Sequence, residues 1–293
     1  MNRRTFIETS IAAAVFTSTA RTAWAASTHH IDRVGLQLYT VRDLMKQDFD
    51  GTLTGVAQIG YKEVEFVDYS GRSPQEARAA LDKNGLTSPS AHFPLEALEK
   101  NPSATIDAAH VIGHTFIVCP YVDARMHNAD GWKRIAETFN RTGEATQKAG
   151  IQFAYHNHSF EFAKTGGLGG KLPYDFLLTE TDPELVKMEM DLCWMTVGGQ
   201  DPVAYFNKYP GRFPLVHVKD WTKEGAGPQD YTFAVGHSVE GHLTNVGSGS
   251  IDWKRIFAES GKAGIQHYYV ENDDAKSLDD PRASYEYLVK LRF

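Results

Sequence analysis

Short β-rich runs alternate with longer amphipathic stretches along the chain from Val34 to the C-terminus. The short runs have the length of strands, whereas apolar residues in the longer stretches recur at helical spacing. The runs predicted as strands are 34–39, 62–67, 87–92, 114–119, 151–156 (or to 158), 186–192, 213–219 and 266–271. Alternation of this kind predicts βαβ units and a parallel sheet.

Helix boundary signals support this division. Phe49, Leu53, Val56 and Ile59 have helical spacing in a predicted helix over 48–59, which Gly60 ends. Further helices are predicted from the Ser73-Pro74 cap to Asn84-Gly85, over 131–149 before Gly150, and after Asp201-Pro202. The eight strands, each with room for one helix, predict a (β/α)8 TIM barrel.

A doubly wound open sheet is the alternative fold. No linker divides the chain, so residues 26–293 are predicted to form a single TIM-barrel domain. The glycine-rich interval 220–264 is longer than a usual connection, which is typical of lids and binding loops. The glycine run at 166–170 lacks a phosphate-binding pattern and predicts a flexible loop.

The first 25 residues have the pattern of an export signal. Arg3-Arg4 precedes a short apolar run at 11–16, and Ala23 and Ala25 stand where a signal peptidase reads small residues. The paired arginines resemble a twin-arginine signal, so we expect a periplasmic or secreted protein. An N-terminal anchor or a plain amphipathic helix is the alternative. Cleavage after Ala25 would change the formal net charge from −7 to −9, because three arginines and one glutamate are removed.

Composition narrows the classes of partner. The chain is 42% hydrophobic and 23% charged, which is typical of a globular protein. Its net charge of −7, without a basic stripe, argues against a nucleic-acid partner. No segment after the signal predicts a membrane span. Cys119 and Cys193 could pair in an oxidising compartment, but small buried thiols are the favoured interpretation.

Polar side chains gather where the predicted strands end. In a TIM barrel these ends form the catalytic rim. The residues concerned are His92, His156, Asn157, His158, Glu161, Asp191, His217, Lys219, Asp220 and Glu271. Strand alternation places Glu189 with Asp191, and His217 with Lys219, on one face. Carboxylates mixed with imidazoles suit a divalent transition metal such as Mn, Co, Zn or Fe.

A metal held in this way predicts proton abstraction beside a carbonyl, because it can stabilise the resulting enediolate. Glu161 and Glu271 are candidates for both ligand and proton carrier, and His156 and His158 are alternative bases. Any one of these histidines could instead serve a purely structural hydrogen bond. Aromatic rings also stack on sugars, so Tyr39 and Trp194 are candidate substrate contacts; core packing is their alternative role.

The other histidines lie outside this pattern. We expect the following to face solvent or to pack: His29, His30, His110, His127 and His267. Two more histidines lie in the long interval and are possible substrate contacts: His237 and His242.

Seven short motifs carry a family resemblance. They are GLQLYTVR at 35–42, SAH at 90–92, YHNHSFEF at 155–162, EMDLCW at 189–194, HVKD at 217–220, VGSGSIDW at 246–253 and VE at 270–271. With these motifs the chain resembles the sugar phosphate isomerase/epimerase group of xylose isomerase-like TIM barrels. The resemblance covers nearly all of the chain after the signal and implies a TIM barrel.

The resemblance also implies a metal held by Glu, Asp, His and Glu. Asp191, His217 and Glu271 match three of these ligands. The strand-five glutamate of the family aligns most simply with His156, but Glu161 follows closely and is the favoured fourth ligand, because it preserves the carboxylate.

The expected substrate contacts are His92, Trp194, Lys219 and Tyr39. Two positions depart from the family. Trp194 stands where relatives commonly have histidine, and Ser248 where many have glutamate.

The leading functional prediction is a metal-dependent isomerase or epimerase that acts on a non-phosphorylated sugar or keto sugar through an enediolate; a homo-oligomer is possible. The phosphate of the family name is not carried over, because export separates an enzyme from intracellular sugar phosphates. The alternative is a lyase that cleaves 3-keto-glycosides by β-elimination. A nuclease like endonuclease IV is opposed by Trp194 and the negative charge. A non-catalytic periplasmic sugar-binding protein is also less favoured.

Overall fold

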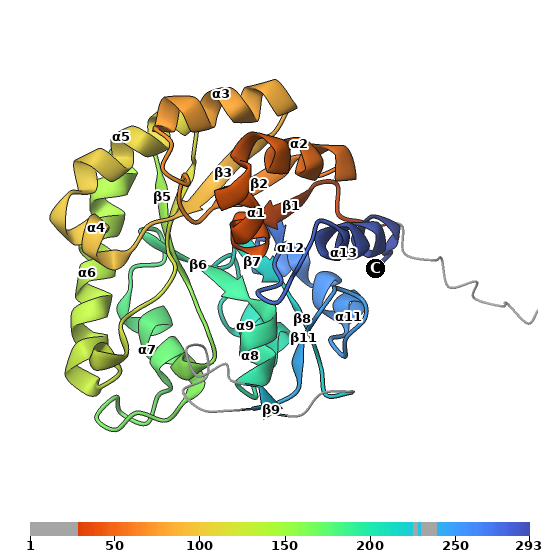
Figure 1. Cartoon of the computed structure of the whole chain (residues 1–293). Coiled ribbons are helices and arrows are strands. Elements are labelled where there is room, and N and C mark those ends of the chain that lie inside the picture. The colour runs from red at the N-terminus through yellow and green to blue at the C-terminus, as the bar shows by residue number, and fades with distance from the viewer. Residues whose placement is uncertain (1–28, 225–227, 230–238) are drawn as a thin grey trace, which may run out of the picture.

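Eight parallel strands close into a barrel in the order β1-β12-β7-β6-β5-β4-β3-β2 (Figure 1). The computed structural model describes residues 29–224, 228–229 and 239–293. The barrel strands are β1 Val34–Gln37, β2 Glu63–Phe66, β3 Thr87–His92, β4 Phe116–Cys119, β5 Gln152–His156, β6 Val186–Asp191, β7 Leu215–Val218 and β12 His267–Val270. The ring closes because β1 pairs with both β2 and β12.

The TIM-barrel prediction is therefore confirmed, and the open sheet is wrong. All eight predicted strands are present, although most are shorter than the sequence indicated. The sixth strand ends at Asp191 rather than at Leu192, which begins α8 Leu192–Val197. The cause is local: Asp191 Oδ1 accepts a hydrogen bond of 2.7 Å from the Trp194 backbone N–H and so caps the new helix.

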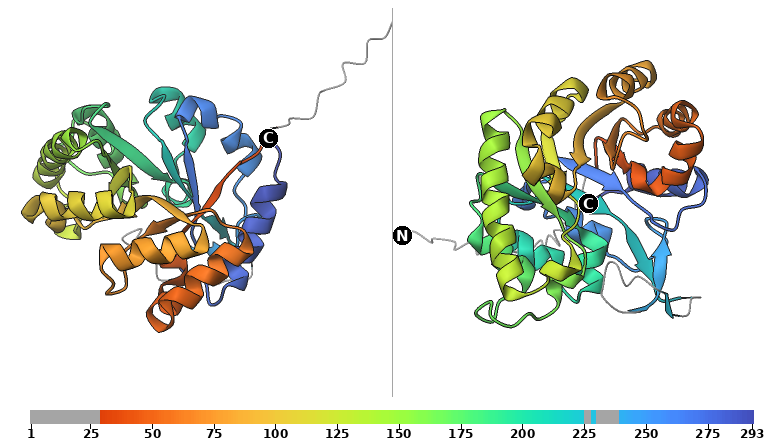
Figure 2. Two further views of the ribbon diagram at one scale, coloured as in Figure 1. Left: turned by 90° about the horizontal axis from the view of Figure 1, so that it is seen from above. Right: turned by 60° about the vertical axis from the view of Figure 1, so that its left-hand side comes forward.

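Helices surround the strands on the outside (Figure 2). Their bounds are α1 Arg42–Gln47, α2 Phe49–Ile59, α3 Pro74–Asn84, α4 Leu95–Lys100, α5 Pro102–Ile112, α6 Ala129–Lys148, α7 Pro173–Glu180, α9 Pro202–Lys208, α11 Trp253–Phe257, α12 Ser260–Ala263 and α13 Asp279–Lys290. Three short 3-10 helices are η1 Leu38–Val41, η2 Ala124–Met126 and η3 Phe160–Phe162. The predicted cap at Ser73 is a complete capping box with Glu76.

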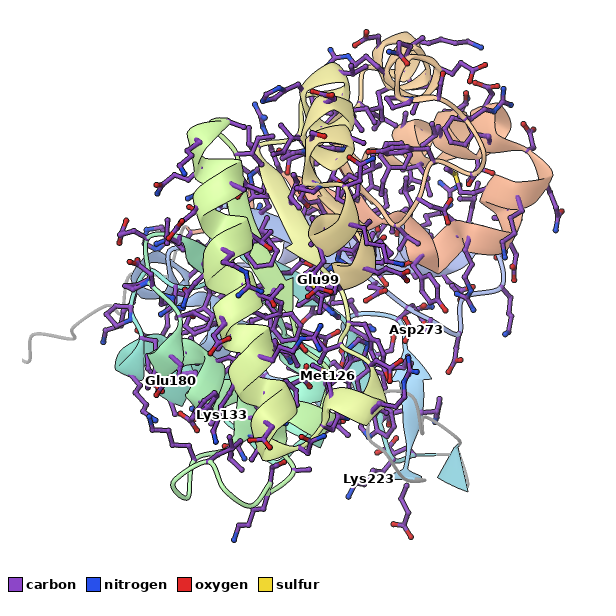
Figure 3. All side chains as sticks on the ribbon, turned by 90° about the vertical axis from the view of Figure 1, so that its left-hand side faces the viewer. Glu99, Met126, Lys133, Glu180, Lys223 and Asp273 are labelled. Atoms are coloured by element: carbon purple, nitrogen blue, oxygen red, sulfur yellow. The ribbon has the colours of Figure 1, made fainter. Side chains whose placement is uncertain are left out.

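The core between barrel and helices fixes which residues of β5 face inward. On α6, which Figure 3 shows along the outside of the barrel with Lys133 on it, Phe139 packs against Phe153 and Tyr155. Their ring centroids lie 5.2 and 4.9 Å from that of Phe139. Because strand side chains alternate, Ala154 and His156 point into the barrel instead. Because Phe153 and Tyr155 pack in the outer core, the His156 side chain points into the barrel.

The long interval 220–264 contains regular structure. β8 Asp220–Thr222 pairs antiparallel with β11 His242–Thr244, and β9 Pro228–Gln229 pairs with β10 Val239–Glu240. α11 and α12 then lead into β12. His242 lies in β11 and is partly buried, whereas His237 falls outside the described residues, as do the predicted signal and its arginines.

Both cysteines are buried and free, as small buried thiols are expected to be. The predicted glycine loop at 166–170 has no helix or strand assigned to it. Among the described residues, no helix is long and apolar enough to cross a membrane.

Candidate active site

A cavity of about 310 Å³ opens at the end of the barrel where the strands reach their carboxyl ends. Its lining combines aromatic, imidazole, carboxylate and ammonium groups. These residues are Tyr39, Val67, His92, Pro94, Pro120, Tyr121, His156, His158, Lys219, Glu271 and Asp273. A concave site with a few converging polar groups is the usual form of a small-molecule site.

Four metal-capable side chains lie together at this cavity, and we call them the pocket group: His156, Asp191, His217 and Glu271. One ligand atom from each lies within 4.8 Å of the others, and all four residues are buried. His217 Nδ1 is 2.8 Å from Glu271 Oε2, and His156 Nε2 is 3.6 Å from Asp191 Oδ2. The sequence-predicted residues Asp191, His217 and Glu271 are thus brought together, with His156 as the fourth.

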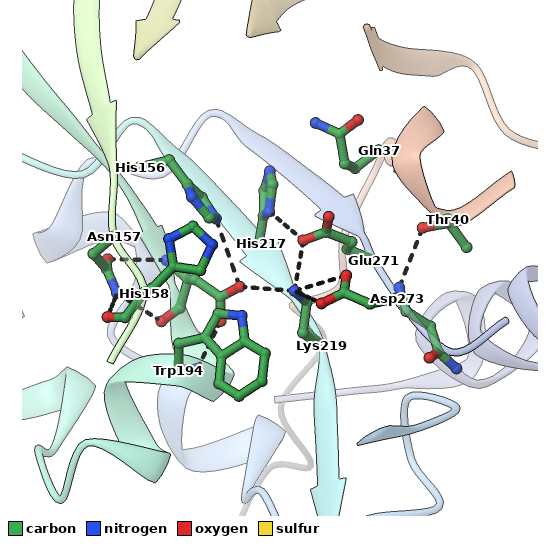
Figure 4. A network of polar contacts seen from close by, with 12 residues as sticks. Gln37, Thr40, His156, Asn157, His158, Trp194, His217, Lys219, Glu271 and Asp273 are labelled. Atoms are coloured by element: carbon green, nitrogen blue, oxygen red, sulfur yellow. Dashed lines mark hydrogen bonds and ion pairs between the residues drawn. The ribbon is translucent and has the colours of Figure 1, made fainter. Parts of the chain in front are cut away.

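Lys219 places a buried cation beside this group. Its Nζ is 2.8 Å from Glu271 Oε2, 3.3 Å from Asp191 Oδ2 and 3.1 Å from Asp273 Oδ1. Figure 4 shows the ammonium between the carboxylates of Glu271 and Asp273, with His156 and His217 turned toward the same space. Three carboxylates thus surround one ammonium, and His217 pairs with Glu271 as a further cationic partner.

The pKa shifts define the charge states of these residues. Burial alone would raise the pKa of Glu271, but Lys219 and His217 hold it well below its usual range. The pKa of Asp191 is also lowered, because Lys219 and His156 outweigh its burial. Burial, together with His217, lowers the pKa of His156. Ionised carboxylates and neutral imidazoles are the forms that bind a metal. Burial would lower the pKa of His217, but Glu189 and Glu271 raise it well above its usual value, so a metal bound through this ring would displace a proton.

Asp273 differs from the other two acids. Burial and the neighbouring Glu271 raise its pKa to about 7, although Lys219 opposes the shift. A carboxyl group that titrates near neutrality and lines the cavity suits a role in proton transfer.

A second set of metal-capable side chains lies deeper in the barrel, and we call it the deep group: Glu65, His92, Glu189 and His217. Each imidazole contacts both carboxylates. His92 Nε2 is 2.8 Å from Glu189 Oε2 and 3.2 Å from Glu65 Oε2. His217 Nε2 is 2.8 Å from Glu65 Oε2 and 3.4 Å from Glu189 Oε2. Burial disfavours charge on His92, but the two carboxylates dominate and raise its pKa to about 9.

Glu161, predicted as the fourth metal ligand, does not join either group. It is fully buried in η3, where its Oε1 accepts a hydrogen bond of 2.5 Å from Tyr155 Oη. Both of its carboxylate oxygens also accept from the His158 backbone N–H, at 3.1 and 3.0 Å. The short η3 turn folds the carboxylate back on the outward-facing Tyr155, so the structure places His156, not Glu161, beside Asp191.

The two candidate sugar-stacking rings occupy different environments. Tyr39 lines the cavity and is partly exposed, with the Arg42 guanidinium 4.3 Å from its ring centre. Trp194 is fully buried and packs against Trp221, with its ring centre 5.1 Å from Lys219 Nζ. Tyr39 is therefore placed to contact a substrate, whereas Trp194 lies beneath Lys219 without an exposed face.

Two polar residues near strand ends use their side chains to accept hydrogen bonds, mostly from backbone N–H groups. Asp220 Oδ2 accepts from the Gly247 and Gly249 backbone N–H groups and from Trp253 Nε1, at 2.9, 3.2 and 3.0 Å. Asn157 Oδ1 accepts from the Asp191 backbone N–H at 3.2 Å and links β5 to β6. These residues hold the rim of the barrel in place.

The histidines predicted to lie outside the site do so. His29, His30 and His110 are exposed, His127 stacks on Phe160 with ring centroids 4.1 Å apart, and His267 is 2.8 Å from Glu63 Oε2. His158, in contrast, lines the cavity as predicted.

The sequence analysis did not predict Glu65 or Asp273 as site residues. It placed Glu189 on the same strand face as Asp191 but did not predict that Glu189 belongs to a separate group. Glu189 shares a strand face with Asp191, so alternation did indicate its direction. Glu65 lies inside an acidic strand segment, Glu63-Val64-Glu65, where the same reasoning could have found it.

The donor set of the pocket group fits a divalent transition metal. Two imidazoles and two carboxylates are ligands that such ions accept. His156 Nε2 and Asp191 Oδ2 are buried, and among the described residues neither makes a hydrogen bond of ordinary geometry. A cation between them would satisfy both atoms.

The chain resembles known proteins over most of its length. The family model described as xylose isomerase-like TIM barrel matches residues 53–288. The chain therefore belongs to the xylose isomerase-like TIM barrel family. It is 27% identical over 270 residues to an inosose dehydratase from Lacticaseibacillus casei, with 83% of this chain and 87% of the relative covered.

Solved structures agree on the architecture. A sugar phosphate isomerase/epimerase from Parabacteroides distasonis superposes with a TM-score of 0.72 at 28% identity, covering 94% of this chain and 99% of that chain. A 3-keto-D-glucoside 4-epimerase from E. coli superposes with a TM-score of 0.61 at 15% identity, covering 87% and 98%. The second likeness shows the shared fold alone.

Proposed function

We propose that the protein is a metal-dependent enzyme that removes a proton next to the carbonyl of a non-phosphorylated keto sugar or cyclic keto polyol. The observation that carries this proposal is the convergence of Asp191, Glu271, His156 and His217 beside the cavity, which His156 and Glu271 line. A divalent ion held by these residues supplies a Lewis acid that stabilises negative charge on a substrate oxygen.

The residues around the ion supply positioning and proton transfer. The Lys219 ammonium lies at the cavity wall, where it can donate hydrogen bonds to substrate oxygens. His158 is the candidate base: it lines the cavity, and burial together with His156 lowers its pKa well below the usual value, which keeps the ring neutral. Asp273 can return a proton, because its carboxyl titrates near neutrality.

Two fates of the enediolate follow from this step. Loss of an oxygen substituent from the next carbon is β-elimination, and the inosose dehydratases support this outcome at 27% identity over most of both chains. Return of the proton to the opposite face is epimerisation, which the name of the sugar phosphate isomerase/epimerase structure supports. We place elimination first because the dehydratases match in sequence over nearly their whole length.

Mass and isotope analysis of the products tests both fates. The purified protein, loaded with Mn²⁺, Co²⁺ or Zn²⁺, is incubated in ²H₂O with inosose, keto sugars and 3-keto-glycosides. Elimination yields a product lighter by one water or by the aglycone, whereas epimerisation conserves mass except for one deuterium. An Asp220→Asn variant is the control for buried-acid substitution outside the pocket group. Absence of both deuterium uptake and elimination in every metal-loaded sample would contradict the proposal.

The proposed periplasmic or secreted location rests on the sequence pattern of residues 1–25. Twin-arginine export acts on folded proteins, and such export suits a protein that acquires its metal before it leaves the cytoplasm. Cell fractionation tests this location. We expect the wild-type protein to be exported and an Arg3→Lys, Arg4→Lys variant to stay inside the cell.

A further inference from the structure

The deep group forms a closed ring of ligand atoms within the barrel. Glu65 Oε2, His92 Nε2, Glu189 Oε2 and His217 Nε2 alternate around it, with successive separations of 3.2, 2.8, 3.4 and 2.8 Å. We propose that the deep group binds a divalent transition metal ion of its own, distinct from the ion of the pocket group. This inference goes beyond the proposed function, which uses the pocket group; the two groups share His217.

The spacing of these four atoms is a few tenths of an ångström from that of a four-coordinate site. Metal to nitrogen or oxygen distances of about 2.0–2.2 Å place the ligand atoms of a tetrahedral site roughly 3.3–3.6 Å apart. Two of the four separations, 3.2 and 3.4 Å, are close to that range, and the two of 2.8 Å are those of the hydrogen bonds that an ion would replace. A shift of a few tenths of an ångström would therefore admit an ion.

Buried neighbours orient the ligands. Gln37 Nε2 donates to Glu65 Oε2 at 2.7 Å, and the Ser90 hydroxyl donates to the other oxygen of Glu65. The second ring nitrogen of His217 is 2.8 Å from Glu271 Oε2. A metal-bound imidazole commonly donates its other N–H to a carboxylate, and such partners fix the direction of the ligand atom.

The charge of the deep group is compatible with a divalent cation. Glu65 and Glu189 are fully buried, and in the described part of the chain neither forms an ion pair with a lysine or arginine. One oxygen of Glu189, Oε1, makes no hydrogen bond with the described residues. This contrasts with the pocket group, whose carboxylates face Lys219. Two buried carboxylates require positive charge, which the His92 and His217 imidazolium groups supply when no metal is bound. A divalent ion carries the same charge and would displace the two ring protons.

An ion can approach the deep group from the cavity. His92 belongs to the deep group and also lines the cavity. It is 7% exposed, whereas the other three residues of the deep group are fully buried. Buried apolar residues, among them Phe116 and Leu215, stand where β4 and β7 begin, at the other end of the barrel from the cavity. The cavity is therefore the route by which an ion would enter.

His217 links the two groups, so their ions must be measured separately. One ring nitrogen faces Glu271 and the other faces Glu65. A neutral imidazole has one nitrogen lone pair for a metal, and binding both ions through this ring requires its full deprotonation. Removing the pocket ion with Asp191→Asn isolates the deep group.

Cobalt binding to that variant tests the proposal. Purified Asp191→Asn protein is stripped with a chelator and titrated with Co²⁺, which is followed by visible absorption and by metal content after removal of the excess. We expect about one ion per chain with the strong visible bands of four-coordinate Co²⁺. Adding Glu189→Gln should weaken binding by about 100-fold or more, since it removes a ligand. Glu63→Gln is the matched control, because Glu63 is a buried glutamate on β2 that contacts His267 instead.

The results separate this inference from the proposed function. The deep site is supported if Asp191→Asn and its Glu63→Gln derivative retain Co²⁺ while the Glu189→Gln derivative loses it. This outcome does not depend on whether Asp191→Asn has lost turnover. No Co²⁺ in Asp191→Asn, or equal binding by the Glu189→Gln and Glu63→Gln derivatives, would overturn it. If the Glu189→Gln derivative does not fold by circular dichroism, His92→Asn replaces it in the same comparison with the same expected loss.

Discussion

The pocket group and the deep group have similar donors but different surroundings. Each combines two imidazoles with two carboxylates, and they share His217. The pocket group borders a cavity and has Lys219 beside its acids, whereas the deep group is closed by Gln37 and Ser90. Open access and an adjacent cation suit chemistry on a substrate. Enclosure and matched partners suit an ion that holds the barrel together.

Strand geometry explains why there are two groups. Glu189 and Asp191 are two residues apart on β6, so their side chains point the same way but differ in height by about 6–7 Å. The interior of a TIM barrel is built in such layers. His217 on β7 pairs in register with Asp191, and its ring reaches the deep group with Nε2 and Glu271 with Nδ1. The difference between the groups is thus one of layer.

Removal of His217 is expected to have the largest effect, since both groups lose a member. His217→Ala should lower turnover by about 10³-fold or more through loss of the pocket ion. It should also destabilise the fold by about 3–5 kcal/mol, because Glu65 and Glu271 lose a buried partner. Kinetics and chemical unfolding measure the two effects. Wild-type turnover in this variant would show that the pocket group is not catalytic.

Asp191→Asn separates the groups by affecting the pocket alone. We expect turnover to fall about 10²–10³-fold while the deep group keeps its geometry, because Asp191 is not one of its members. Steady-state rates with excess metal measure the loss. Asp220→Asn is the paired control, since its carboxylate binds backbone N–H groups rather than facing the cavity. Equal losses of turnover in the two folded variants would contradict the assignment of Asp191, rather than any buried acid, to the active site.

Lys219→Met removes the cation that distinguishes the pocket group. Without it, Asp191, Glu271 and Asp273 repel one another, and the free energy of unfolding of the chelated protein should fall by about 3 kcal/mol. Added Mn²⁺ or Zn²⁺ should raise the melting temperature more in the variant than in the wild type, because the ion then supplies the positive charge that Lys219 supplies in the wild type. A smaller metal-induced rise in the variant would count against this charge balance.

Glu161→Gln tests the placement of Glu161 outside both groups. Burial raises the pKa of Glu161 to about 8, so the folded protein keeps its proton where the unfolded chain has lost it. This contribution to stability is present below about pH 4.3 and declines as the pH rises toward 8.

Between pH 5 and 8 the free energy of unfolding of the variant should therefore fall by about 3–4 kcal/mol less than that of the wild type, measured by urea unfolding. Its metal content should equal that of the wild type. A loss of bound metal would restore Glu161 as a ligand.

Tyr39→Leu should have the smallest effect, because it changes one wall of the cavity and neither group. Losing an aromatic contact to a sugar is worth about 0.5–1.5 kcal/mol, so KM should rise roughly threefold to tenfold with little change in kcat. Substrate saturation curves measure this split. A fall in kcat at constant KM would instead assign Tyr39 to the chemical step.

The fold could be predicted from sequence because strand and helix patterns repeat eight times. Each unit carries its own caps and apolar spacing, and an error in one strand end, such as Leu192 for Asp191, leaves the count unchanged. The pocket residues Asp191, His217 and Glu271 could also be predicted, because strand ends meet at one rim.

The remainder of the site depends on local folding that spacing does not reveal. Glu161 lies near His156 in sequence, but η3 turns it onto Tyr155. Trp194 follows a strand end, yet helix capping by Asp191 buries it. Glu65 is followed by the apolar Phe66, so β2 has no polar strand end to draw attention to it. Sequence therefore predicted the layer at the rim and missed the deeper one.

The most direct test of the central claim is solvent deuterium uptake by a keto sugar or keto polyol in the presence of the protein. The metal-loaded wild-type protein should catalyse exchange or elimination at the carbon beside the carbonyl, the chelated protein should not, and Asp191→Asn should be reduced about 10²-fold or more. Activity that is unchanged by chelation and by Asp191→Asn would contradict the assignment of the pocket group as the metal-dependent site of proton abstraction.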